Sequence, residues 1–325
     1  MVKIISIFLL SWLTLSVQAY TVPLKKGAKT PIQRVEPMNW WVGMQNPELQ
    51  ILVYGKNMAA YRPEVNYPGV KIDRVVTTAN PNYEFIYLTI APETQPGEME
   101  IVFKKDGKKA FAYSYPLLAR EKNSAMRKGF DQSDVIYLLM PDRFANGNPA
   151  NDSHPDVTEK ADRSNPNGRH GGDIQGIIDH LDYLQDLGVT ALWSTPLMED
   201  NQPVTSYHTY AITDYYKIDP RYGTNADYKR LSAEAKKHGI KLVMDVVTNH
   251  CGSAHWWMND LPAEDWVHQF DTFTRSNYRM GTIPDPYASE VDRELNSKGW
   301  FDTSMPDLNQ RNPLLMDYLI QNAIW

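Results

Sequence analysis

The sequence has little of what disulfide-stapled, nucleic-acid-binding or membrane-spanning proteins need. Cys251 is the only cysteine among 325 residues, so no disulfide can form within the chain. The 33 lysine and arginine residues include no basic run of five or more, whereas a nucleic-acid partner demands a concentrated basic face. The apolar run at residues 4–17 is shorter than the roughly 20 residues of a comfortable membrane span. We therefore expect an ordinary globular protein with no nucleic-acid partner.

The first residues carry the pattern of an export signal. Lys3 precedes the apolar run, and Ala19 closes it with a small side chain. A positive start, a short apolar centre and a small-residue end are typical of a secretory signal peptide, here residues 1–19. An uncleaved anchor is the alternative. Export without disulfides fits a bacterial periplasm or the outside medium, so we expect an exported protein with no membrane contact after signal cleavage.

Residues 20–125 have a short, β-like rhythm. Runs such as 49–55, 85–90 and 99–103 are rich in β-branched and aromatic side chains, and Asp106-Gly107 offers a tight hairpin turn before the next run. This spacing predicts an antiparallel, immunoglobulin-like β-sandwich of about 100 residues. A polar stretch at 120–129 resembles a linker, which leaves residues 126–325 for a second domain.

The second domain alternates strand and helix patterns. Apolar strands at 135–140, at 189–195 and from Ile240 onward are separated by segments with helical spacing, which predicts parallel βαβ units. An open doubly wound sheet shares this rhythm, but no Gly-x-Gly-x-x-Gly turn follows the first strand, so a (β/α)8 TIM barrel is favoured. A whole barrel needs about 250 residues. We expect an incomplete barrel in a chain that ends before the fold is finished.

The third barrel strand carries polar residues where an apolar strand would not. Asp245 lies within it, and Asn249 and His250 follow at the carboxyl end, where barrel proteins place their function. A buried charge costs several kcal/mol unless it is paired. The three side chains therefore either hold a ligand or form a closed hydrogen-bond network, and the spacing leaves both open.

Four segments in chain order resemble the α-amylase superfamily of glycoside hydrolases, in its neopullulanase and cyclomaltodextrinase branch. They are residues 35–41 with the sandwich that follows, 207–223, 245–250 and 305–309. The resemblance implies a retaining hydrolase that acts on α-glucans such as starch, pullulan or cyclomaltodextrins. It also explains the long excursion at about 250–305 as a small domain inserted after the third strand.

The resemblance implies roles for three substrate-binding residues. Tyr210 would stack on the glucose ring beside the cleaved bond, Asp245 would fix the geometry of the site, and His250 would donate a hydrogen bond to a sugar hydroxyl. Without the resemblance, Tyr210 could as well be a core tyrosine, and Trp256-Trp257 could line outer sugar subsites or pack in the core.

The resemblance also indicates what the chain lacks. Retaining cleavage needs two carboxylates about 5–5.5 Å apart. In the family these come from the fourth and fifth strands, so we expect the nucleophile and the acid/base to lie beyond Trp325 and the chain itself to have no catalytic residue and no hydrolase activity. The alternative is a non-catalytic carbohydrate-binding or scaffold relative. Homodimer formation through the sandwich is left open.

Two oxygen-rich loops point to a metal ion. Residues 146–152 and 171–173 combine Asn and Asp with Gly and Pro, a composition that suits Ca²⁺ but also plain Asx turns or a glycosylation sequon at Asn151. Zinc is not expected, because no Cys-x-x-Cys or helical His-Glu-x-x-His accompanies His250, Cys251 and His255. Calcium-binding family members have similar residues here, so the resemblance implies a structural calcium ion held by Asn146, Asn148, Asn151, Asp152, the Gly171 carbonyl and Asp173.

Overall fold

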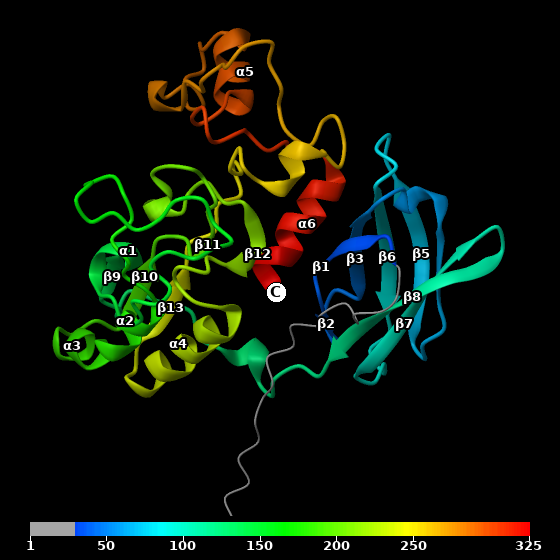
Figure 1. Ribbon diagram of the computed structural model, residues 1–325, viewed down its shortest axis with the longest axis horizontal. Coiled ribbons are helices and arrows are strands. Elements are labelled where there is room, and N and C mark those ends of the chain that lie inside the picture. The colour runs from blue at the N-terminus through cyan, green and yellow to red at the C-terminus, as the bar shows by residue number, and fades with distance from the viewer. Residues whose placement is uncertain (1–29) are drawn as a thin grey trace, which may run out of the picture.

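The computed structural model describes residues 30–325, so the expected signal peptide at 1–19 lies outside the described residues. A β-rich part comes first and an α/β part follows, with a small helical segment projecting beyond both (Figure 1). Within residues 30–325, none of the helices has the length and apolar content to cross a bilayer.

The β-rich part is two four-stranded sheets. The first has the order β1-β3-β6-β5 and is antiparallel throughout, and the second has the order β2-β8-β7-β4. The hairpin between β7 and β8 turns at Asp106 and Gly107, both with positive φ, as expected. The predicted sandwich is confirmed, and its pairings are antiparallel except that the short β2 runs parallel to β8. Its strands are β1 (Ile32–Glu36), β2 (Trp40–Trp41), β3 (Glu48–Gly55), β4 (Arg62–Val65), β5 (Val70–Thr77), β6 (Tyr83–Ile90), β7 (Gly97–Lys105) and β8 (Lys108–Leu118).

Strand β6 is buried on both of its faces. Ile86 and Leu88 point between the two sheets, whereas Tyr83, Phe85 and Tyr87 alternate with them and point the other way. Those three aromatic side chains belong to a second core, shared with helix α6 (Pro313–Ile324) and with tryptophans of the inserted segment. The sandwich and the α/β part are therefore joined by one continuous apolar core.

Polar contacts fix the register of this junction. The backbone N–H of Gln50 donates to the Gln321 side-chain oxygen at 2.7 Å, and the Gln321 amide donates back to the Gln50 carbonyl at 2.7 Å. The Gln321 side chain of α6 thus hydrogen-bonds the β3 backbone just past the last residue of β3 that pairs with β1. The Tyr318 hydroxyl donates to buried Glu36 at 2.8 Å, so α6 is held to two strands of the same sheet.

The α/β part holds a parallel sheet of β9 (Ile136–Leu139), β10 (Ala191–Ser194) and β13 (Lys241–Met244), in the order β13-β10-β9. Helices α2 (Ile174–Asp179), α3 (Leu181–Asp186) and α4 (Asn225–Lys237) pack against it, and the short α1 (Pro141–Phe144) follows β9. Apolar residues recur at helical spacing through residues 174–184, but the backbone leaves helical geometry at His180 and divides this segment into α2 and α3. The predicted sandwich-plus-barrel fold class is confirmed.

One face of the parallel sheet is uncovered in the described residues. The apolar pattern of the strands predicts burial on both faces, yet Leu138 of β9 is 59% exposed and Trp193 of β10 is 40% exposed. Three strands cannot close a cylinder, so the side chains that would point into a barrel interior meet solvent.

Two further features complete the α/β part. The antiparallel pair β11 (Met198–Glu199) and β12 (Asp214–Ile218) follows β10. After β13 comes the predicted insertion, with η4 (Trp256–Asn259), η5 (Tyr278–Met280) and α5 (Glu290–Lys298). Trp257 is fully buried in the shared core and Trp256 packs on Tyr54, so both serve packing at this junction.

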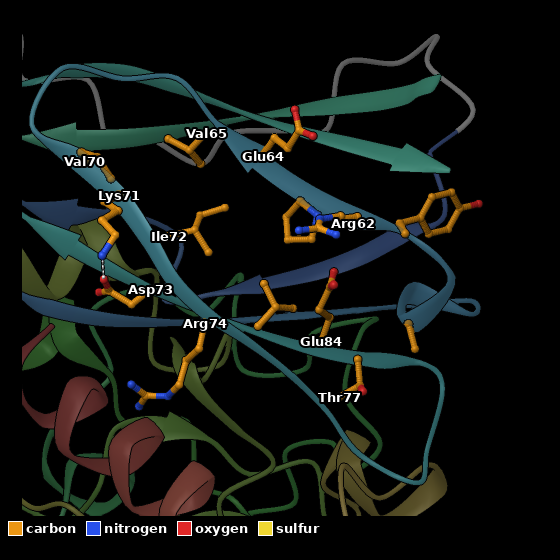
Figure 2. A pocket seen from close by; sticks show the side chains of 14 residues that line it. Arg62, Glu64, Val65, Val70, Lys71, Ile72, Asp73, Arg74, Thr77 and Glu84 are labelled. Carbon is orange, nitrogen blue, oxygen red and sulfur yellow. Dashed lines mark ion pairs between the residues drawn. The ribbon is translucent and has the colours of Figure 1, made fainter. Parts of the chain in front are cut away.

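A hollow of about 780 Å³ opens between β4 and β5, an edge strand of each sheet (Figure 2). Arg62 of β4, Arg74 of β5 and Glu84 of β6 are among its lining residues. Glu84 is only 1% exposed and its Oε2 has no hydrogen-bond partner. Burial raises the pKa of Glu84 to about 8, so this carboxyl group holds its proton at neutral pH.

Glu84 predicts a pH-dependent loss of stability. Its pKa is about 8 in the folded protein and close to 4.5 in the unfolded chain, so the folded state binds the extra proton between these values and the free energy of unfolding falls as pH rises through that window. Between pH 5 and pH 9, Glu84→Gln should remove roughly 4 kcal/mol of this fall. Urea denaturation across the range measures it.

The matched control is Glu64→Gln, which changes an exposed carboxylate lining the same hollow and paired to Lys104 at 2.6 Å. It should leave the pH profile unchanged. Parallel profiles for wild type and Glu84→Gln would contradict the assignment.

Candidate functional site

The structure brings the three predicted substrate-binding residues together. The Tyr210 hydroxyl donates to Asp245 Oδ2 at 3.0 Å, and His250 Nε2 lies 3.2 Å from the Tyr210 carbonyl oxygen. Asp245 follows directly after the last residue of β13, so the cluster lies at the carboxyl ends of the parallel strands. Side chains from two distant segments thus form one hydrogen-bonded group.

Trp193 is a member of this group that sequence reasoning missed. Its indole Nε1 donates to Asp245 Oδ2 at 3.3 Å from the neighbouring strand β10. In the sequence, Trp193 resembles one more apolar strand residue. The signal was its position near the carboxyl end of a strand next to the one that carries Asp245, in register with Val243.

The Tyr210 phenol is held as a hydrogen-bond donor. Burial, followed by the charge of Asp245, raises the pKa of Tyr210 to about 12, so the hydroxyl keeps its proton. The bond to Asp245 fixes the ring through its far end. A ring held in this way loses little rotational freedom when a ligand stacks on it.

The His250 imidazole is neutral and already hydrogen-bonded on both nitrogens. Burial lowers the pKa of His250 to about 4, although the hydrogen bond to the Tyr210 carbonyl opposes this shift. Nε2–H donates to that carbonyl, and Nδ1 accepts from the Asn249 side-chain amide at 3.1 Å. A sugar hydroxyl that accepted a hydrogen bond from Nε2–H would therefore compete with the Tyr210 carbonyl for that donor.

A buried ionic network supports the Tyr210 loop. Arg221 pairs with Asp219 at 2.7 Å, Arg169 lies 3.7 Å from both Asp219 and Asp142, and all four side chains are almost fully buried. Burial alone would raise the pKa of Asp219, but the two arginines lower it below its ordinary value. Arg169 also donates to the Ser206 carbonyl at 2.9 Å, just before Tyr210.

The two oxygen-rich loops also meet. Asn146 Nδ2 donates to Asp152 at 2.7 Å, and the backbone N–H of Asn148 donates to Asp173 at 2.8 Å. Gly171 has a φ of +87°, and a Cβ there would lie 2.7 Å from the Asp152 carboxyl carbon, so only glycine fits beside that carboxylate. Asp173 also caps α2 by accepting from Gly176 at 2.6 Å.

Some oxygens of these loops lack partners. Asn146 Oδ1 and Asn151 Oδ1 are buried without a hydrogen bond, which is costly unless a cation or water satisfies them. Within residues 30–325, no three His, Cys, Asp or Glu side chains are arranged to hold a metal, so a cation here would depend on amide and carbonyl oxygens. Such a donor set fits a hard ion of the Ca²⁺ type.

Comparison with known families matches most of this chain to two family models. The family described as "Alpha amylase, catalytic domain" matches residues 138–324, more than half of the chain. The chain belongs to the α-amylase family. The N-terminal domain of cyclomaltodextrinase matches residues 34–121, which contain most of the sandwich. The order of the two matches follows the order of the two parts of the structure.

Individual α-amylase relatives are longer than this chain. It is 31% identical to neopullulanase 2 from Thermoactinomyces vulgaris over 255 residues, which are 74% of this chain and 40% of that protein. It is 32% identical to a cyclomaltodextrinase from Geobacillus thermopakistaniensis over 217 residues, 66% of this chain and 35% of the relative. A solved α-amylase structure from Anoxybacillus is 39% identical, with 59% of this chain and 37% of that chain covered and a TM-score of 0.48.

The ionic network generates a stability prediction. Arg169→Met removes a buried charge shared between Asp142 and Asp219, each of which keeps another arginine as a partner. It should therefore cost about 3 kcal/mol of unfolding free energy, measured by urea denaturation. Arg163→Met removes an exposed arginine 3.8 Å from Asp152 and should cost less than about 1 kcal/mol. Equal losses of unfolding free energy in the two variants would contradict a stabilising role for the buried network.

Proposed function

We propose that the protein is a retaining α-glucan hydrolase of the neopullulanase or cyclomaltodextrinase type. The convergence of Tyr210, Asp245 and His250 at the carboxyl end of the parallel sheet is the observation that carries the proposal. The names of its relatives, neopullulanase, cyclomaltodextrinase and maltogenic amylase, support the substrate class.

The chemistry of the cluster suits a neutral sugar. A glucose unit offers hydroxyls and apolar C–H faces and has no charge, so it is recognised by hydrogen-bonding groups and aromatic faces. In our proposal Tyr210 supplies the aromatic face, and the neutral His250 imidazole shares its one N–H between the Tyr210 carbonyl and a sugar hydroxyl. Asp245 keeps the phenol in place and accepts from the sugar with its remaining lone pairs.

Cleavage requires groups that this cluster does not supply. A retaining hydrolase uses one carboxylate as nucleophile and a second as acid and base, about 5–5.5 Å apart. The family resemblance assigns both to the fourth and fifth parallel strands, whereas residues 30–325 form three. We propose that residues 1–325 bind α-glucan and that hydrolysis needs those further strands.

Sugar binding tests the proposal directly. Isothermal titration of the chain with maltoheptaose should show binding, and Tyr210→Ala should weaken it at least about tenfold because the stacking face is lost. Tyr183→Ala, at an exposed tyrosine of α3, is the matched control and should bind as wild type does. Absence of binding, or equal affinity for wild type and Tyr210→Ala, contradicts the proposal. Release of reducing sugar from pullulan by residues 1–325 contradicts the assignment of cleavage to further strands.

A calcium ion in the oxygen-rich loops belongs to the same proposal. Asn146, Asn148, Asn151, Asp152, Asp173 and the Gly171 carbonyl would hold it, and it would pin the long loop without touching substrate. The unpartnered buried oxygens of Asn146 and Asn151 support this assignment.

Calcium binding predicts a shift in thermal stability. Excess EDTA should lower the melting temperature by several degrees, and added Ca²⁺ should restore it, because an ion that binds only the folded state stabilises it. Asn151→Ala should abolish the response, whereas Asn167→Ala in the exposed loop that follows should keep it. A melting temperature that stays the same with EDTA and with Ca²⁺ would contradict the assignment of a calcium site.

Export is the remaining part of the proposal, and the signal it depends on, residues 1–19, lies outside the described residues. The charge and apolar pattern of those residues supports it. Expression of the gene in a bacterial host should yield a periplasmic or secreted protein whose first residue is about Tyr20. A cytoplasmic product that retains residues 1–19 would contradict it.

A further inference from the structure

A column of stacked rings runs from the site into the inserted segment. The rings of His250 and Phe301 have centroids 5.0 Å apart with an angle of 22° between planes. Those of Phe301 and Tyr278 are also 5.0 Å apart, at 25°. The Arg279 guanidinium lies 5.3 Å from the Tyr278 ring centroid, and its Nε donates to the Tyr278 hydroxyl at 2.8 Å.

Main-chain pairing on both sides sets the position of Phe301. On one side, Ser276 donates to the Trp300 carbonyl at 2.8 Å and Trp300 donates to Thr274 at 2.9 Å. Gly299 makes this approach feasible, because a Cβ there would lie 2.6 Å from the Ser276 Cα. On the other side, hydrogen bonds join the segment after Phe301 to the segment of His250: Ser253 to Ser304 at 2.8 Å, Cys251 to Pro306 at 3.2 Å and Leu308 to Asn249 at 3.0 Å.

Hydrogen bonds to the ring nitrogens and to the backbone carbonyl hold His250 at its end of the column. Its two nitrogens contact Tyr210 and Asn249, and the hydroxyl of buried Tyr215 donates to its carbonyl oxygen at 2.9 Å. These bonds lie in the ring plane or on the backbone and leave the ring faces to packing. Phe301 covers one of those faces.

Both rings that stack with Phe301 belong to the protein itself. His250 and Tyr278 each have a ring centroid 5.0 Å from that of Phe301, with nearly parallel planes. The contribution of Phe301 to binding is therefore expected to pass through a neighbour. The neighbour within the site is His250, which in turn holds the Tyr210 carbonyl.

We infer that Phe301 is a positioning residue that, by stacking on His250, fixes the Tyr210 loop and with it the phenol–carboxylate pair of Tyr210 and Asp245. The inserted segment thereby sets the shape of the site without touching the ligand. The identity of the ligand that the pair binds rests on the proposed function. The stacking of Phe301 on His250 and its effect on the Tyr210 loop do not depend on that function.

The first test is an NMR titration of the His250 C2–H, assigned with His250→Gln. Removing the ring in Phe301→Ala admits water to the imidazole face, so the pKa of His250 should rise by at least about one unit from its value near 4. Phe301→Tyr keeps a ring and should titrate as wild type does. The charged or titratable groups on the elements around this histidine are His208, Asp245, Asp307 and Arg279.

The second test is the affinity of the same variants for maltoheptaose. Phe301→Ala should bind about tenfold more weakly, and Phe301→Tyr should lie within about twofold of wild type. Phe273→Ala is the matched control, because Phe273 lies in the same inserted segment but meets Trp300 edge-on and outside the column. It should change neither the titration nor the affinity. If Phe301→Ala does not fold, Phe301→Leu keeps the bulk without the ring and carries the same expectations.

The outcomes separate the two claims. An unmoved His250 titration in Phe301→Ala overturns the positioning role, and so does a moved titration with unchanged affinity. If the wild-type chain fails to bind maltoheptaose, the proposed function fails; the titration, together with loss of the NMR contacts between the His250 and Tyr210 side chains in Phe301→Ala, then decides the positioning role alone.

Discussion

The buried pairing of Arg169 with Asp142 and Asp219 is the interaction on which both candidate sites depend. Asp142 accepts the backbone N–H groups of His170 and Gly171 in one oxygen-rich loop, while Arg169 holds Ser206 before Tyr210. Isolated, each charge would cost several kcal/mol to bury, so the network persists only as a unit. The sugar cluster and the oxygen-rich loops are therefore supported by one set of side chains.

The sandwich contributes to the site through helix α6. Its outer sheet face buries Tyr83, Phe85 and Tyr87 against the α/β part. From α6, Asn322 donates to the Tyr215 carbonyl at 2.7 Å, and the Tyr215 hydroxyl donates to the His250 carbonyl. His250 is thus fixed from the sandwich side through α6 and from the insertion side through Phe301. The sandwich acts as part of the scaffold of the site, since the outer face of its β1-β3-β6-β5 sheet is buried against the α/β part.

The sequence predicted what is encoded locally. Runs of β-branched and aromatic side chains marked the sandwich strands, helical spacing marked segments between the parallel strands, and the polar interruption at Asp245 marked the rim of the sheet. The sequence could not show which surface covers β6, because that surface includes a helix far along the chain. The apolar side chains on both faces of β6 were the signal that something covers it. The Phe301 stack was equally hidden, since it arises from main-chain pairing of segments remote in sequence. The break at His180 was missed because apolar spacing continues across it.

The central claim is that polar groups at the carboxyl end of the parallel sheet receive a glucose unit. A crystal structure of the chain with maltotetraose measures this most directly. We expect one glucose ring stacked on Tyr210, with hydroxyls in hydrogen-bond reach of Asp245 and His250. Density for the sugar only in the hollow between β4 and β5, with the Tyr210 face bare, would contradict it.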